Sequence, residues 1–159
     1  MLKKRRIRVL AVAACAAVVA AVAIVLPASG TAPAGSAFFA KLDGEHEPGG
    51  GDPDGYGTFS GLFNGTKLCY GLQVAKIGTP QAAHIHQAPI GSDGPIKVTL
   101  NKPATGGADA SKGCITLSTT LANAIKSNPR GFYVNVHTST FSGGAVRGQL
   151  FQANATQDK

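Results

Sequence analysis

The sequence lacks the short motifs by which several enzyme classes are identified. It has no G-x-S-x-G element for a hydrolase nucleophile and no C-x-x-C pair. Residues 55–60 do not complete a G-x-G-x-x-G dinucleotide fingerprint, and a β-type run follows them where a helix is required. Paired carboxylates are also missing from the strand-like runs, which leaves a glycosidase without an acid and a base. These absences favour a protein that is not an enzyme.

Charge is scarce and unevenly distributed. Charged residues make up 14% of the 159 residues, and the formal net charge is +7. Five of the fifteen cations precede the first apolar run: Lys3, Lys4, Arg5, Arg6 and Arg8. Beyond Ala34, ten Lys or Arg stand against eight Asp or Glu, a net charge of +2. A nucleic-acid partner is therefore excluded, because binding to phosphates requires a basic face on the folded part of the chain.

The basic N-terminus introduces a leader. Residues 9–26 are uninterruptedly apolar, and Ala32-Pro33-Ala34 offers an A-x-A cleavage site, so residues 1–34 are predicted to be a signal peptide with the start of a linker. An uncleaved membrane anchor is the main alternative, because this run is near the minimum length of a span. Lipidation at Cys15 is a weaker alternative to a cleaved signal peptide. We expect an exported protein, secreted or in the cell envelope, that touches a membrane only through this segment.

Export affects how the remaining cysteines are interpreted. An oxidising compartment favours pairing, and Cys69 and Cys114 are the only two cysteines after the leader. The bridge would close a loop of about 45 residues and contribute on the order of 4 kcal/mol. A metal-binding or catalytic thiol is the alternative, but the two cysteines lack C-x-x-C spacing and neither has a directly adjacent basic residue.

After a linker at residues 27–37, short strand-like runs alternate with Gly, Pro, Asn and Asp. The expected strands are 38–42, 58–63, 68–74, 82–86, 96–100, 113–117, 132–137 and 145–151. One short helix is expected over 118–128, between a Ser/Thr cap and Pro129. This pattern predicts an all-β domain over 38–153, a Greek-key-like sandwich or barrel of about eight strands, followed by a polar tail at 154–159.

Two of these strands carry most of the polar residues with chemical potential. Because side chains alternate in a strand, His84 and His86 share one face. By the same rule Tyr133, Asn135 and His137 share a face, opposite a core-facing set at 132, 134 and 136. Arg147 and Gln149 share a face of the last strand. If these strands are neighbours, three of the four histidines converge with an Asn, an Arg and a Gln.

Four ordered segments resemble the CHRD domain, a module named after chordin and also found in exported bacterial proteins. They are Ala83-His84-Ile85-His86, Gly94-Pro95-Ile96-Lys97-Val98, Phe132-Tyr133-Val134-Asn135-Val136-His137-Thr138 and Gly144-Ala145-Val146-Arg147-Gly148-Gln149-Leu150. The resemblance covers about residues 38–151, and a subset of the family is similar in carrying a cysteine pair. It implies an all-β extracellular domain without a defined biochemical role. The loop at 45–57 departs from the family in being rich in Gly and acids.

Two interpretations of the histidines remain open. In one, His84, His86 and His137 hold copper or zinc, the metals that suit imidazole, for metal carriage or redox chemistry. In the other, they hydrogen-bond strand ends and loops. A dinuclear superoxide dismutase site is excluded, because it needs about six histidines and the chain has four.

We therefore predict a non-enzymatic exported module that binds an extracellular protein or an envelope component, with a mononuclear three-histidine metal protein as the alternative. Asn135, Arg147 and Gln149 are candidate binding residues. A calcium site in the acidic loop, from Glu45, His46, Glu47, Asp52 and Asp54, is weaker than a solvated loop, because no Glu stands at EF-hand spacing.

Overall fold

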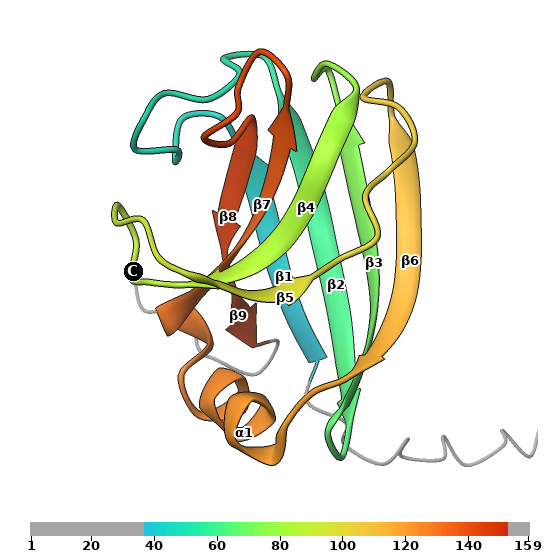
Figure 1. Ribbon diagram of the computed structural model, residues 1–159, viewed down its shortest axis with the longest axis vertical. Coiled ribbons are helices and arrows are strands. Elements are labelled where there is room, and N and C mark those ends of the chain that lie inside the picture. The colour runs from blue at the N-terminus through green and yellow to red at the C-terminus, as the bar shows by residue number, and fades with distance from the viewer. Residues whose placement is uncertain (1–36, 153–159) are drawn as a thin grey trace, which may run out of the picture. The chain divides into compact units, whose positions relative to one another are not determined.

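The strands of this protein form one continuous antiparallel sheet that curls into a half-barrel (Figure 1). The computed structural model describes residues 37–152. The strand order is β5-β4-β7-β8-β1-β2-β3-β6, with β9 paired to β1. The predicted leader, the lipidation site and the polar tail lie outside the described residues.

The elements follow the chain in this order: β1 (Ala37–Asp43), β2 (Tyr56–Asn64), β3 (Lys67–Ala75), β4 (Pro80–Gln87), β5 (Ile96–Thr99), β6 (Asp109–Thr116), α1 (Thr119–Ser127), a 3-10 turn η1 (Pro129–Gly131), β7 (Phe132–Thr138), β8 (Val146–Gln149) and β9 (Phe151–Gln152). The all-β prediction with one short helix is confirmed. The strands curl within one sheet, so the architecture is closer to the barrel than to the two-sheet sandwich.

Two strand predictions differ clearly from the structure, whereas the others agree to within two residues at each end. β6 begins at Asp109, four residues before the predicted start at 113, because it lies at the edge of the sheet and its polar side chains carry no apolar signal. The predicted strand at 145–151 divides into β8 and β9. β8 pairs with β7 and, at Arg147, with β1, whereas β9 pairs with β1 alone, and the break between the two strands falls at Leu150.

The apolar core lies on the inner face of the curled sheet. Alternate residues of β1 and β2 are buried there, among them Phe38, Leu42, Phe59 and Phe63. The helix α1 adds Ala122 and Ile125 to this core, and the Ser118 side chain caps it by accepting a hydrogen bond from the Leu121 amide at 3.2 Å. The helix prediction is confirmed.

The strand β7 differs from β1 and β2 because it is buried on both faces. Its inner face contributes Phe132, Val134 and Val136 to the core. Its outer face, with Tyr133 and Asn135, is also buried, although it carries polar groups. A buried polar face requires hydrogen-bond partners, so the loops next to β7 must supply them.

The predicted disulfide between Cys69 and Cys114 is formed. These residues lie directly opposite each other on β3 and β6, with Cα atoms 4.0 Å apart. Bridges of this kind are typical of oxidising, extracytoplasmic compartments. Within residues 37–152, no helix is long and apolar enough to cross a membrane.

Candidate metal centre

The strands β4, β7 and β8 lie side by side and bring the predicted site residues together. β7 is the central strand, with β4 on one edge and β8 on the other. Asn135 of β7 pairs with His84 on one side and with Arg147 on the other. Tyr133 likewise lies between His86 and Gln149. The convergence expected from alternation along each strand is therefore present.

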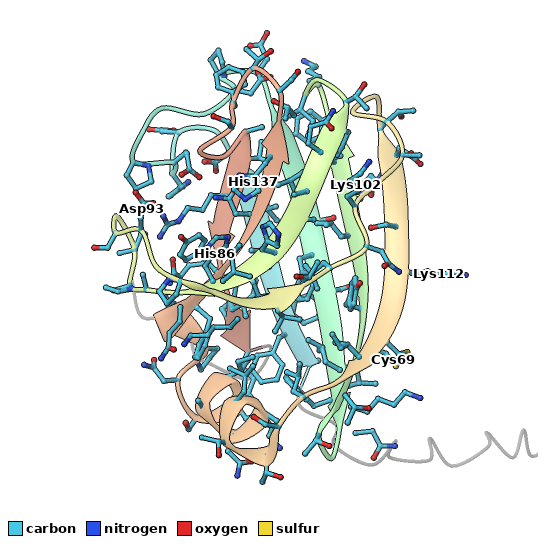
Figure 2. All side chains as sticks on the ribbon, in the orientation of Figure 1. Cys69, His86, Asp93, Lys102, Lys112 and His137 are labelled. Carbon is cyan, nitrogen blue, oxygen red and sulfur yellow. A yellow bond between two sulfur atoms is a disulfide. The ribbon has the colours of Figure 1, made fainter. Side chains whose placement is uncertain are left out.

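The three histidine rings of this face form a compact cluster. The ring centroids are 5.2 Å apart for His84 and His137, 5.5 Å for His84 and His86, and 5.9 Å for His86 and His137. One nitrogen of each ring lies within 4.8 Å of one nitrogen of both others. Figure 2 shows His86 and His137 on the same part of the sheet, with Cys69 on the far side of the domain. The cysteine pair is thus not part of the cluster.

Hydrogen bonds define the protonation of two of these rings. His86 donates from Nδ1 to the Gly94 carbonyl at 2.9 Å, and His137 donates from Nδ1 to the Ser142 carbonyl at 3.0 Å. A carbonyl can only accept, so the proton must be on Nδ1 in both rings. In the neutral imidazole, Nε2 then carries a free lone pair. Both loop contacts match the structural interpretation of the histidines, but they engage only one nitrogen of each ring.

The second nitrogens have no protein partner. His84 Nδ1, His86 Nε2 and His137 Nε2 are buried and make no hydrogen bond with the described residues. Leaving a buried polar atom unpaired costs about 1–3 kcal/mol. Three such atoms lie on neighbouring rings, and two amide oxygens of the same face, Asn135 Oδ1 and Gln149 Oε1, are likewise buried without a partner among the described residues.

The cluster favours neutral imidazoles. Burial lowers the pKa of His84, and the neighbouring His137 and His86 lower it further. Burial also lowers the pKa of His86, although its hydrogen bond to the Gly94 carbonyl works in the opposite direction. Neutral rings are the form that binds metals, so these shifts reduce competition by protons.

A hollow of about 410 Å³ gives access to the cluster. His84 and His137 form part of its wall, together with Ile96 and Ser142, while His86 does not reach it. His86 is only 8% exposed, whereas His84 and His137 are half-buried. An ion would therefore approach from the His84 and His137 side and meet His86 last.

Beside the cluster, three side chains form a stack. The Tyr133 ring lies parallel to His86, with centroids 4.8 Å apart and an interplanar angle of 9°. The Arg147 guanidinium lies 3.4 Å from the Tyr133 centroid. Since β4 and β8 flank β7 on opposite edges, His86 and Arg147 cover opposite faces of the tyrosine ring. Such contacts combine aromatic stacking with a cation–π interaction.

The predicted binding residues Arg147 and Gln149 face the loop at 88–95. Arg147 is 1% exposed and bonds the Ser92 and Pro89 carbonyls, at 2.6 and 3.3 Å, and the Asp93 carboxylate at 3.3 Å. Gln149 donates to the Ala88 carbonyl at 2.8 Å. The donors of these side chains bond the main chain and the carboxylate of this protein itself, whereas the buried Gln149 Oε1 has no partner among the described residues.

Asn135, the third predicted binding residue, contacts the acidic loop. It is 1% exposed and donates from Nδ2 to the Glu47 carboxylate at 3.1 Å. Burial raises the pKa of Glu47, and Arg147 opposes that rise. The expectation of a wholly solvated loop was wrong for Glu47, which is 6% exposed. The described acids of this loop do not join a metal-binding cluster, since the three histidines form the only group of that kind in residues 37–152.

A family model supports the resemblance drawn from the four segments. The CHRD domain model matches residues 38–150, which is most of the chain. The chain belongs to the CHRD family. Searches of curated proteins and of solved structures gave no match. In this CHRD domain, the histidine cluster, the stack and the polar face all lie inside the matched range.

Sequence reasoning missed the contact of Glu47 with Asn135, the contact of Gly94 with His86 and the stacking role of Tyr133. The glycines of the loop that holds Glu47 were a signal that this loop is packed. A Cβ on Gly44 would lie 2.0 Å from the Asp52 carbonyl oxygen, and one on Gly51 would lie 2.5 Å from that of Ala145. Glycines at such close approaches indicate a packed loop, not a solvated one. Gly94 is similar, because its Cβ would lie 2.0 Å from the Gln87 carbonyl oxygen.

Proposed function

We propose that this CHRD domain binds one copper or zinc ion through His84, His86 and His137, and that it acts as a non-enzymatic metal-binding protein. The observation that supports this most is the set of three buried ring nitrogens without protein partners. The two Nδ1-to-carbonyl bonds add support, because metal-binding histidines usually donate their other ring N–H in this way.

The donor set fits these metals in chemistry and approximately in size. Imidazole suits copper and zinc, and both cysteines of the domain are consumed in the disulfide. Nitrogens bound to one zinc ion at about 2.0–2.1 Å are about 3.3–3.6 Å apart. The widest separation in the cluster, up to 4.8 Å, must therefore shrink by about 1.2–1.5 Å, a movement that rotations of the side chains can supply.

Metal loading tests this function directly. Purified protein is incubated with Cu²⁺ or Zn²⁺, desalted and analysed for metal per chain. We expect about one equivalent for the wild type and none for the double variant His84→Ala, His86→Ala. The matched control is His46→Ala, because His46 is the one histidine outside the cluster and bonds Asp43 instead. Wild-type protein that retains no more metal than the double variant would overturn the proposal.

Binding strength should follow the Irving–Williams order. Cu²⁺ binds more tightly than Zn²⁺ at a given set of nitrogen ligands. We therefore expect Cu²⁺ to displace Zn²⁺ from the loaded protein, and bound Cu²⁺ to show nitrogen hyperfine coupling by electron paramagnetic resonance. An excess of Zn²⁺ that displaces copper would contradict copper as the preferred ion.

We also propose that the protein is exported, with a leader at 1–34 and a CHRD domain over 38–153. The apolar run behind a basic N-terminus and the Cys69–Cys114 bridge support this. Cell fractionation with N-terminal sequencing tests it. A cleaved leader gives a mature chain beginning near residue 35, and an intact N-terminus in the membrane fraction indicates an anchor. Full-length protein in the cytoplasm would contradict export.

A further inference from the structure

We propose that Arg147 is a positioning residue for the metal ligand His86, acting through the loop at 88–95 and through the ring of Tyr133. This inference deepens the proposed function and rests on it. Arg147 does not touch the cluster nitrogens in any hydrogen bond. Its role would be to hold the groups that hold His86.

The first connection runs through the loop. Three acceptors of the loop converge on the Arg147 guanidinium: the carbonyls of Pro89 and Ser92 and the carboxylate of Asp93. The loop then supplies Gly94, whose carbonyl accepts the Nδ1 proton of His86. Asp93 is largely exposed, with 74% of its side chain accessible, so the shorter contact to the Ser92 carbonyl, at 2.6 Å, is the stronger part of this anchor.

The second connection runs through Tyr133. Its hydroxyl accepts a hydrogen bond from the Gly94 amide at 3.2 Å, and its ring separates the Arg147 guanidinium from the His86 imidazole. Gly94 is therefore bonded at its amide by Tyr133 and at its carbonyl by His86. Only glycine fits at this position, because a Cβ would collide with the Gln87 carbonyl.

The consequence for a metal follows from the tautomer. As long as the Gly94 carbonyl stays in place, the proton of His86 stays on Nδ1 and the buried Nε2 keeps its lone pair. If the loop moves, either nitrogen can carry the proton and the ring can turn. Loss of such an outer partner typically lowers metal affinity by about 10- to 100-fold.

Three substitutions separate positioning from a merely structural role. Arg147→Met removes all three hydrogen bonds to the loop. Arg147→Lys keeps the positive charge, but one ammonium group cannot reproduce the planar set of guanidinium donors. Tyr133→Phe keeps the stacked ring and removes only the hydroxyl that holds Gly94. The matched control is Lys126→Met. Lys126, on the helix α1, makes the same two kinds of contact away from the histidine cluster. It donates to the Gly65 carbonyl and lies over the Phe63 ring.

Two readouts are required. In metal-free protein at about pH 8, where imidazoles are neutral, nitrogen NMR reports which ring nitrogen of His86 carries the proton. Competition with a chelator then gives the Zn²⁺ affinity of the loaded protein. We expect His86 to change from a pure Nδ1–H form to a mixture in Arg147→Met, with the Zn²⁺ affinity lowered by about tenfold. Tyr133→Phe should shift both readouts in the same direction by a smaller amount, Arg147→Lys should be intermediate, and Lys126→Met should match the wild type.

The outcomes decide between the two proposals. A folded Arg147→Met protein that keeps the Nδ1–H form and the wild-type affinity overturns the positioning role. If Arg147→Met does not fold, Tyr133→Phe decides in its place, and unchanged readouts in that variant overturn the role. Wild-type protein without affinity for Zn²⁺ or Cu²⁺ overturns the proposed function instead. The tautomer measurement, made without metal, distinguishes that failure from a failure of the positioning role.

Discussion

The Asn135 side chain of β7 donates a hydrogen bond to the Glu47 carboxylate over 3.1 Å, joining a central strand to a loop 88 residues earlier in the chain. Both residues are buried. The bond fastens the loop between β1 and β2 over the outer face of β7, where a second contact, from the Asp52 amide to the Ala145 carbonyl at 2.8 Å, supports it. Asn135, on the polar face of β7, is thus covered by the loop that sequence composition assigned to solvent.

Replacing Glu47 by Gln should change how stability depends on pH. The folded-state pKa of Glu47 is raised by burial above its unfolded value of about 4.5, so the folded protein binds the proton more tightly. Its contribution to stability is therefore present below about pH 4.5 and decreases as the pH rises through the folded pKa. Urea denaturation of the wild type between about pH 4 and 8 should show this decrease relative to Glu47→Gln. Parallel curves for the two proteins would contradict it.

The histidine cluster predicts a pH effect of the opposite sign. The pKa values of His84 and His86 are lowered in the folded state from about 6.5, chiefly by burial. Their contribution to stability is therefore present above about pH 6.5 and is lost as the pH falls through the folded values. In metal-free protein, thermal unfolding between about pH 8 and 5 should show a smaller loss for His84→Gln than for the wild type. Equal losses in the two proteins would count against the burial effect. His46→Gln, at an exposed position, is the control.

Gly144 should tolerate no side chain. Its φ is +153°, and a Cβ would lie 2.3 Å from the Glu47 carboxylate and 2.6 Å from the Asn135 amide. We expect Gly144→Ala to lower the free energy of unfolding by about 1–3 kcal/mol and to loosen the Glu47–Asn135 bond. Gly143→Ala is the matched control, because a Cβ on Gly143 meets nothing within 4 Å. Chemical denaturation of the two variants measures the difference, and equal stabilities would disprove the clash.

Removing the disulfide should destabilise the domain without affecting metal content. The bridge spans 45 residues, so the chain-entropy model gives a loss of about 4 kcal/mol for Cys69→Ala, Cys114→Ala. Neither sulfur belongs to the histidine cluster, so metal per chain should remain near the wild-type value under conditions where the variant is folded. Denaturation and elemental analysis test the two statements separately.

In the oxidised wild type, thiol titration in denaturant should find no free thiol at either position, and two reactive thiols would disprove the bridge.

Much of this architecture could be predicted from local pattern. Alternation of apolar and polar residues predicted most strands, and Ser118 and Pro129 marked the ends of the helix correctly. The same alternation predicted that His84 and His86 share a face and that Tyr133, Asn135 and His137 share another. These results follow from the two-residue period of a strand, which is a property of neighbouring residues alone. At the start of β6 the residues show no alternation of apolar and polar side chains, so the same rule failed to predict that part of the strand.

The tertiary structure decided which of these faces meet and what they do. The placement of β4 and β8 on either side of β7 brings His137 to His84 and His86, and it places Tyr133 between His86 and Arg147. It also turned Asn135, Arg147 and Gln149 toward loops of the same chain and buried Glu47 among them. The sequence by itself determined the strands, their two faces and the family, since these depend on local alternation and on ordered motifs. Only the tertiary structure decided the cluster and its supports, because pairing between strands dozens of residues apart depends on the packing of the whole sheet.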